Sequence, residues 1–434
     1  MKKFILCFLI ISLSAGVVNA QDANPAAYRF TLEDCLEYAF NENYNRQSLK
    51  LSEEASQDTY EQSKKERLPS LNASISESFS SSKNDYSSWG GNYGVSASVA
   101  LYRGGSINNT IEQSKLRAQQ SEHQTSRYEN NLTIQILQSF LTVLGNEELL
   151  KFQEAVVTAS EEQLNQGREQ FNVGKILESD FLLLESQYAN DKNNIVDTKI
   201  NRDNNLLTLK GLLSMHPEND LQIIYPDTSA LIQMSLMPPL DYVMERTMGT
   251  LPDIKISKSN VEIAQVGIKL AKANYSPTIS LNGSIGTGHN SNYNNFGTQL
   301  SDRLNEQIGV TVSIPIFDNS RTKSKVTQSR IALQQAELDK KQTELDVLQS
   351  IASEYQNVVS AYNKYQTTDI RQNAYLRTFE VYTAQFNAGA ITAVDLLQQQ
   401  NNYISALNDF IQSKYGFMLK RKILDVYMGE KITM

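Results

Sequence analysis

Few residues of this 434-residue chain have the type and spacing to do chemistry. His123, His216 and His289 stand far apart, and each is interpreted as a surface or loop residue rather than a metal ligand or catalytic base. Cys35 is the only cysteine beyond the first 20 residues, so an intrachain disulfide and a cysteine-based zinc or redox site are not expected. Without a clustered nucleophile, base or ligand set, the sequence favours neither an enzyme nor a resident metal or cofactor.

One motif does occur twice and joins a glycine to a carboxylate. Phe171-Asn172-Val173-Gly174 is followed by Asp180, and Phe386-Asn387-Ala388-Gly389 is followed by Asp395. Each glycine is predicted to adopt a positive φ that ends one helix before the next begins. Thr392 and Asp395 have the spacing of a capping box at a helix start, and Asp180 fits the same capping interpretation.

The motif belongs to a much larger repeat. The offset of 215 residues between its copies also maps Leu101-Tyr102 onto Ile316-Phe317, whereas earlier in the chain an offset of 208 maps Pro69 onto Pro277. A unit of this length indicates duplication of a whole structural half rather than a solenoid repeat. The predicted division is residues 1–20 as a signal peptide, 21–214 as the first repeat, 215–239 as a linker with a short strand near 221–225, 240–430 as the second repeat, and 431–434 as a tail.

The chain is predicted to be exported. Lys2 and Lys3 precede an apolar run from Phe4 to Val18, and Val18-Asn19-Ala20 is typical of a signal-peptide cleavage site. No later run approaches the length of a membrane helix, so a protein that stays in a membrane would have to use a β-barrel. The net charge of −8 argues against nucleic acid as a partner.

Two kinds of segment must position the glycine–aspartate motifs. The first kind is long, polar, poor in proline and glycine, and predicted to be helical, with an apolar heptad such as Leu396, Tyr403 and Phe410. Because these predicted helices have polar residues on more than one side, a hollow coiled-coil assembly is favoured over a solid bundle. The predicted helical segments are residues 31–67, 106–170, 176–210, 241–275, 321–387 and 391–427.

The second kind of segment alternates apolar with small polar residues. Two strand pairs are predicted, at 70–102 and at 277–317, with the final strand running from Val310 to Ile316. Such ten-residue alternation is typical of membrane barrel strands. Loops rich in serine, asparagine and glycine are expected at 80–92 and 287–305, and the second, longer one holds the extra residues.

Aromatic residues stand near both ends of these strands. They are predicted to form interfacial girdles, although ordinary packing of strand ends is the alternative. One rim would contain Tyr86, Trp89 and Tyr93, and the other Tyr102, Tyr275 and Phe317. Four strands are too few to close a barrel, so two, three or four chains would have to contribute 8, 12 or 16 strands.

These features together resemble the TolC family of outer-membrane efflux proteins over nearly the whole mature chain. The resemblance rests on the order helix, strand pair, very long helix, tip turn and helix, occurring twice, and on Pro69 and Pro277 before the strands. It implies an α/β membrane protein in which a homotrimer forms a 12-stranded barrel in the outer membrane and a coiled-coil helical tunnel in the periplasm. It also implies passive export, with a periplasmic adaptor (a membrane fusion protein) and an inner-membrane pump of the RND or ABC type as partners, besides outer-membrane lipid. A trimeric surface-anchored adhesin and a periplasmic adaptor are the alternatives.

The family resemblance also implies roles at the tips. Asp395 matches an acidic position that rings the closed periplasmic entrance, and three copies around an axis would favour cations. Asp180 and Ser179 match linking positions, and Phe386 stands where a linking tyrosine occurs. Ile391 and Gln398 depart from the family's basic linking and second acidic positions. The exposed tip, expected to contact the adaptor or to serve only as a turn, comprises Val173, Gly174, Lys175, Ala388, Gly389 and Ala390.

Overall fold

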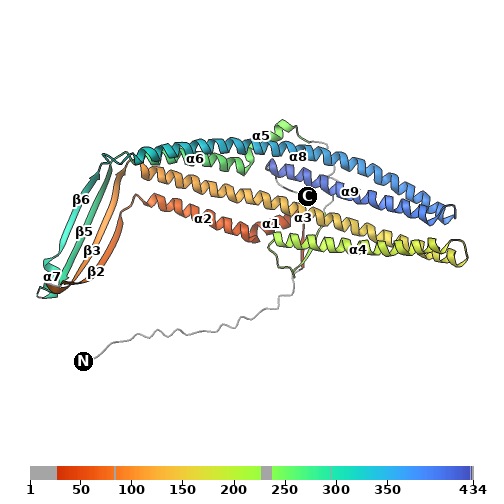
Figure 1. Cartoon of the computed structure of the whole chain (residues 1–434), viewed down its shortest axis with the longest axis horizontal. Helices are drawn as coiled ribbons and strands as arrows, with labels where there is room; N and C mark the ends of the chain where they lie inside the picture. The colour runs from red at the N-terminus through yellow and green to blue at the C-terminus, as the bar shows by residue number, and fades with distance from the viewer. Residues whose placement is uncertain (1–26, 83–84, 226–236, 294, 431, 433–434) are drawn as a thin grey trace, which may run out of the picture.

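The computed structural model describes residues 27–82, 85–225, 237–293, 295–430 and 432. The predicted signal peptide therefore lies outside the described residues, as do residues 226–236 of the linker and most of the tail. Figure 1 shows a four-stranded sheet at one end of an elongated molecule, and long helices that run from it to two turns at the opposite end.

The first half of the chain begins with a short strand and ends with a long helical hairpin. Its elements are β1 (Ala27–Phe30), α1 (Leu32–Glu42), α2 (Tyr44–Lys65), β2 (Ser70–Ser82), β3 (Asp85–Arg103), α3 (Ser106–Asn172) and α4 (Glu178–Leu212).

The second half follows the same order, with one extra short helix. Its elements are β4 (Asp220–Ile223), α5 (Leu240–Thr250), α6 (Pro252–Ala273), β5 (Thr278–Asn290), α7 (Phe296–Asp302), β6 (Asn305–Ser313), α8 (Arg321–Asn387) and α9 (Ala393–Tyr427). α3 and α8 have 67 residues each, and α4 and α9 have 35 each. The predicted bounds of α8 agree with the structure.

The helix predicted from Thr31 to Arg67 is broken at Asn43, so that prediction was wrong. The Asn43 side chain caps α2 by accepting from the Arg46 backbone N–H at 3.0 Å, and its amide group donates to the Leu212 carbonyl at 2.9 Å. Because the buried Asn43 side chain hydrogen-bonds backbone groups of both α2 and α4, the helix can break here without proline or glycine. The corresponding break in the second half lies at Leu251, before Pro252 at the start of α6.

The sheet has the order β2-β3-β5-β6, and all its neighbours are antiparallel. Val95 lies opposite both Ala73 and Ile285, so one face is built from the apolar set of each strand. The outer edges of β2 and β6 have no partner strand among the described residues. The sheet therefore has an apolar face and two open edges.

Three predictions about this sheet need correction. Residues 80–92 are mostly strand, since β2 continues to Ser82 and β3 begins at Asp85. Likewise β5 extends to Asn290, and the following loop contains α7. β6 ends at Ser313 rather than at Ile316, because Pro315 lacks the N–H that a ladder requires.

The main apolar core lies midway along the helices and joins both halves. Phe140 of α3, Leu209 of α4 and Met418 of α9 pack together with residues of α1. Cys35 belongs to this core, and burial raises the pKa of its thiol to about 12, so the thiol is unreactive at neutral pH. The parallel pair β1–β4 packs beside this core, since Leu221 of β4 is one of its buried residues.

Candidate functional site at the helix tips

Two turns lie at the end of the molecule far from the sheet (Figure 1), and their backbone geometry is the same. Gly174 and Gly389 have φ values of 73° and 74°, as predicted for both. After α3, the Lys175 N–H bonds the Gln170 carbonyl at 2.8 Å, and after α8 the Ala390 N–H bonds the Gln385 carbonyl at 2.9 Å. These are Schellman turns, in which the left-handed residue lets the chain reverse directly into the next helix.

Replacing Gly389 by alanine is expected to destabilise the tip by about 1–2 kcal/mol, because an L-residue is strained at this φ. A Cβ at Gly389 would meet no atom within 4 Å, so the cost comes from the backbone alone. The same change at Gly416 within α9 also meets no atom, and there it should stabilise by roughly 0.5–1 kcal/mol. Thermal unfolding followed by circular dichroism would measure both, and shifts of the same sign would contradict the argument.

The tips differ at the start of the returning helix. The backbone N–H and hydroxyl of Thr392 both donate to Asp395 Oδ2, at 3.2 and 2.6 Å, and the Asp395 N–H donates to the Thr392 hydroxyl. The predicted capping box is thus present at α9. Hydrogen bonds from the Thr392 hydroxyl and then its backbone N–H lower the pKa of Asp395 below its ordinary value.

Asp180 lies in the first turn of α4, where the helix dipole favours a carboxylate, but it has no capping box. Asp180 stands at the equivalent position of α4, but the residue before that helix is Leu177, which provides no side-chain hydrogen bond. The two acidic positions of the repeat therefore have different neighbours. The Asp395 carboxylate is held by its own backbone turn, whereas the half-buried Asp180 lacks this restraint.

The phenylalanines of the two motifs also differ. Phe386 is 2% exposed and packs in a cluster with residues of α3, α4 and α9. Phe171 lies at the surface and stacks on Phe181, with ring centroids 5.5 Å apart. The second tip thus rests on the first hairpin through Phe386. The other buried members of this tip cluster are Leu164, Leu184, Ala393, Leu396 and Leu397.

The remaining predicted tip residues are exposed. Val173, Lys175, Ala388 and Ala390 project at the turns, in agreement with an accessible surface there. Ser179 is also exposed, and Gln398 bonds Asn402 one turn along α9 at 3.3 Å. Within one chain these side chains do not converge on a single point.

A buried polar group near the tips was missed from the sequence. Asp191 of α4 is 2% exposed and contacts Gln187 of its own helix and Gln400 of α9. The available signal was a heptad of Leu184, Asp191 and Thr198, all of which are buried. Phe181, Tyr188 and Ile195, which form an apolar heptad on the same helix, are only half-buried.

The aromatic residues predicted as girdles lie at both ends of the sheet. Trp89 donates its indole N–H to Glu77 at 2.8 Å, and the Tyr93 hydroxyl donates to the same carboxylate. Glu77, which was not predicted as a site residue from the sequence, is thus an acidic group on the apolar face. Tyr102, Tyr275 and Phe317 are exposed where the sheet meets the helices. Tyr86 lies in β3, and its side chain is outside the described part.

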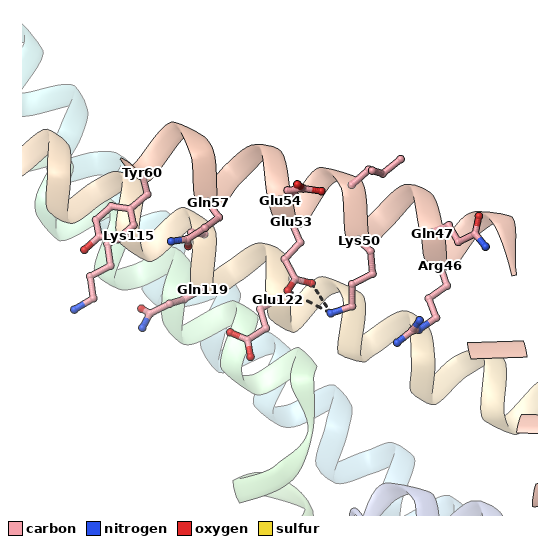
Figure 2. A pocket seen from close by; sticks show the side chains of 12 residues that line it. Arg46, Gln47, Lys50, Glu53, Glu54, Gln57, Tyr60, Lys115, Gln119 and Glu122 are labelled. Atoms are coloured by element: carbon pink, nitrogen blue, oxygen red, sulfur yellow. Dashed lines mark hydrogen bonds and ion pairs between the residues drawn. The ribbon is translucent and has the colours of Figure 1, made fainter. Parts of the chain in front are cut away.

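An open groove of about 880 Å³ runs between α2 and α3 (Figure 2). Its lining is mixed in charge, and Lys50 pairs with Glu53 at 3.0 Å within it. The groove lies on the same side of the molecule as the open edge of β2. In the part of the chain that the structure describes, no helix has the length and apolar character to cross a membrane.

Comparison with known proteins places the chain in a family. Residues 38–214 and 245–430 match the model of the outer membrane efflux protein family. The outer membrane protein TolC of Vibrio cholerae is 20% identical over 354 residues, which cover 78% of this chain and 80% of that protein. The alkaline protease secretion protein AprF of Pseudomonas aeruginosa is 19% identical, over 76% of this chain and 66% of its own length.

Solved structures share the fold. The crystal structure of CusC, described as a transmembrane channel, superposes with a TM-score of 0.80 at 16% identity and covers 92% of each chain. The family model matches most of the chain in two blocks that correspond to its two halves. The chain therefore belongs to the outer membrane efflux protein family, whose members are channels of the outer membrane with a periplasmic helical part and are not enzymes.

Proposed function

We propose that three copies of this chain form one exit duct, with a 12-stranded barrel in the outer membrane and a helical tunnel in the periplasm. The observation that carries this proposal is the four-stranded sheet with one apolar face and two unpartnered edges. Open edges are not tolerated in lipid, so β2 of one copy must pair with β6 of the next. Three such sheets give the twelve strands, and the two halves (21–214 and 240–430) are products of a duplication.

The helices next to the sheet form a row whose two outer members correspond to the two edge strands of the sheet. α2, α3, α6 and α8 lie side by side next to the sheet, in the order of its strands (Figure 1). α2 is the outer helix on the side of β2, and α8 is the outer helix on the side of β6. The groove between α2 and α3 (Figure 2) is therefore the surface against which α8 of the neighbouring copy packs. Repeated by a three-fold rotation, this head-to-tail contact closes into a ring around a central passage.

The exposed tips are the docking surface for a periplasmic adaptor, which would connect the duct to an inner-membrane pump of the RND or ABC type. Val173 and Lys175 of one turn and Ala388 and Ala390 of the other are exposed at the end most distant from the sheet. The duct would pass cargo that the pump delivers, without chemistry of its own. An adhesin is disfavoured, since the strands alternate with the helices along the chain.

The test of this proposal is efflux by intact cells. Deleting the gene should increase the accumulation of a fluorescent dye and the sensitivity to detergents, and the wild-type gene should reverse both. A cysteine in β2 and another in β6 should give disulfide-linked trimers in the outer membrane. If the protein is found as a monomer in the outer membrane, or is absent from that membrane, the proposed trimeric duct is refuted. A trimer without any dye effect would leave a dedicated secreted polypeptide as the cargo.

Replacing Asp395 by asparagine is expected to raise the single-channel conductance or to weaken block by divalent cations, because three carboxylates near the axis would be lost. The matched variant Thr392→Val removes the hydroxyl that holds Asp395 but keeps the charge. If Asp395 acts only as a cap, the two variants should behave alike in planar bilayers. Unchanged conductance and block in Asp395→Asn trimers would exclude the gate role.

A further inference from the structure

A carboxylate is buried where the two helical hairpins meet. Asp191 Oδ1 accepts from Gln187 Nε2 at 2.8 Å, and its Oδ2 accepts from Gln400 Nε2 of α9 at 3.3 Å. Ser160 of α3 also interacts with this carboxylate and opposes the effect of burial on its pKa, while its hydroxyl donates to the Val157 carbonyl at 3.1 Å. Three helices from both hairpins thus converge on one ionisable group. The first hairpin is α3–α4, the second is α8–α9, and the bond from Gln400 to Asp191 is one of the contacts between them.

No cation compensates this carboxylate among the described residues. Arg202 of α4, Arg371 of α8 and Lys414 of α9 are paired with other acids. The other titratable groups around it are Glu161 on α3, Lys192, Tyr188 and Asp197 on α4, and Tyr403 on α9. Desolvation is the largest influence and raises the pKa of Asp191 above its ordinary value of 3.8.

A cavity of about 210 Å³ with both polar and apolar lining residues lies against Asp191. Asp197 and Thr198 of α4 line it, together with Gln153 of α3 and Asn408 of α9. The side-chain carbonyl oxygens of Gln153, Asn408 and Gln400 are buried and have no hydrogen-bond partner in the described structure. The cavity has room for several water molecules, so a proton has a route to the carboxylate.

We propose that Asp191 is a proton-operated lock between the two hairpins, which holds α4 against α9 when the carboxyl group is neutral and releases them when it is ionised. A neutral carboxyl group must donate its proton to an acceptor. The Gln400 carbonyl oxygen is such an acceptor, because turning the amide over places it where the nitrogen now contacts Asp191. The inference rests on the proposed role of the tips as the closable end of the duct.

The sign of the effect follows from linkage. The packed junction binds the proton more tightly than a separated, hydrated junction, so acid favours packing. This stabilisation is complete below the ordinary pKa near 3.8 and is lost as the pH rises through the raised pKa of the packed state. At pH values between the ordinary pKa and the raised pKa of Asp191, the ratio of packed to separated hairpins should change by up to about tenfold per pH unit.

The experiment measures the distance between the hairpins in full-length trimers. Spin labels at Glu185→Cys on α4 and Gln398→Cys on α9, both exposed sites, would be introduced in a Cys35→Ser background and diluted with unlabelled chain. Pulsed electron resonance at pH 5 should give a single short distance, and at pH 8 a longer population should grow. Asp191→Asn, which resembles the neutral form, should keep the short distance at both pH values.

Two further variants sharpen the test. Gln400→Glu places a second carboxylate against Asp191 and should enlarge the long-distance population at pH 8. Asp197→Asn changes an exposed acid of the same cavity and should respond to pH as the wild type does. A wild-type distance that is insensitive to pH, or an Asp191→Asn protein that still responds, would overturn the lock. Because the readout needs no transport, a failed efflux assay with an intact distance response would refute only the proposed function.

Discussion

Replacing Ile308 by lysine is expected to prevent the assembly of stable trimers in the outer membrane. Ile308 of β6 is exposed on the apolar face of the sheet, directly opposite Gly283. A lysine in the lipid-facing position near the bilayer midplane costs about 2–4 kcal/mol in each chain. Three copies would bear this cost in one barrel, so the effect on assembly should exceed that on a single strand.

The neighbouring residue provides a matched control. Gln307 points to the opposite, polar face, because successive side chains alternate across a strand. Gln307→Lys should therefore leave the amount of heat-resistant trimer in outer-membrane fractions unchanged, while Ile308→Lys should lower it severely. Equal losses in the two variants would mean that the apolar face does not contact lipid, and the barrel would have to be abandoned.

Replacing Leu396 by alanine is expected to loosen the tip of the second hairpin. Leu396 is fully buried in the tip cluster beside Phe386, so removing its side chain should cost about 2–5 kcal/mol through lost transfer energy and a cavity. The cluster joins α9 to α3 and α4, and its weakening should let the tips separate. Cells without the pump should then admit antibiotics that are normally too large for the outer membrane.

Val394→Ala is the control for this second prediction. Val394 lies two residues earlier in α9 and is exposed, so its truncation should change stability by at most about 0.5 kcal/mol. The measurements are the minimal inhibitory concentration of vancomycin and the urea concentration at half-unfolding of the purified protein. A Leu396→Ala protein that is destabilised but excludes vancomycin would show that the cluster supports folding without restraining the entrance.

Much of the architecture could be read from local signals. The absence of breakers between Arg321 and Asn387 predicted α8 from end to end, and the left-handed turns at Gly174 and Gly389 followed from their place after long helices. The period-two pattern located the strand pairs. These features depend on backbone preferences and on periodicities of a few residues, which a single chain carries without reference to its partners.

The boundaries that failed depend on contacts across the chain. The break at Asn43 is fixed by hydrogen bonds that reach Leu212 and Tyr128, far away in sequence. The loop predicted at 80–92 is strand, because β3 pairs with β2 and β5 along almost its whole length. Small polar residues that resemble a loop become a strand once neighbours satisfy their backbone groups.

The duplicated order of elements, the turns, and the apolar and polar faces of the strands follow from residue spacing along the chain, so the amino-acid sequence predicts them. Which copy of each motif is buried depends instead on packing between distant segments. Phe386 enters the tip cluster while Phe171 stays at the surface, and Asp395 is capped by Thr392 while Asp180 follows Leu177. Likewise Asp191 becomes a buried acid only because α9 packs against α4. The physical reason is that each of these helices has polar residues on several sides, so the helix that packs against it decides which side is removed from water.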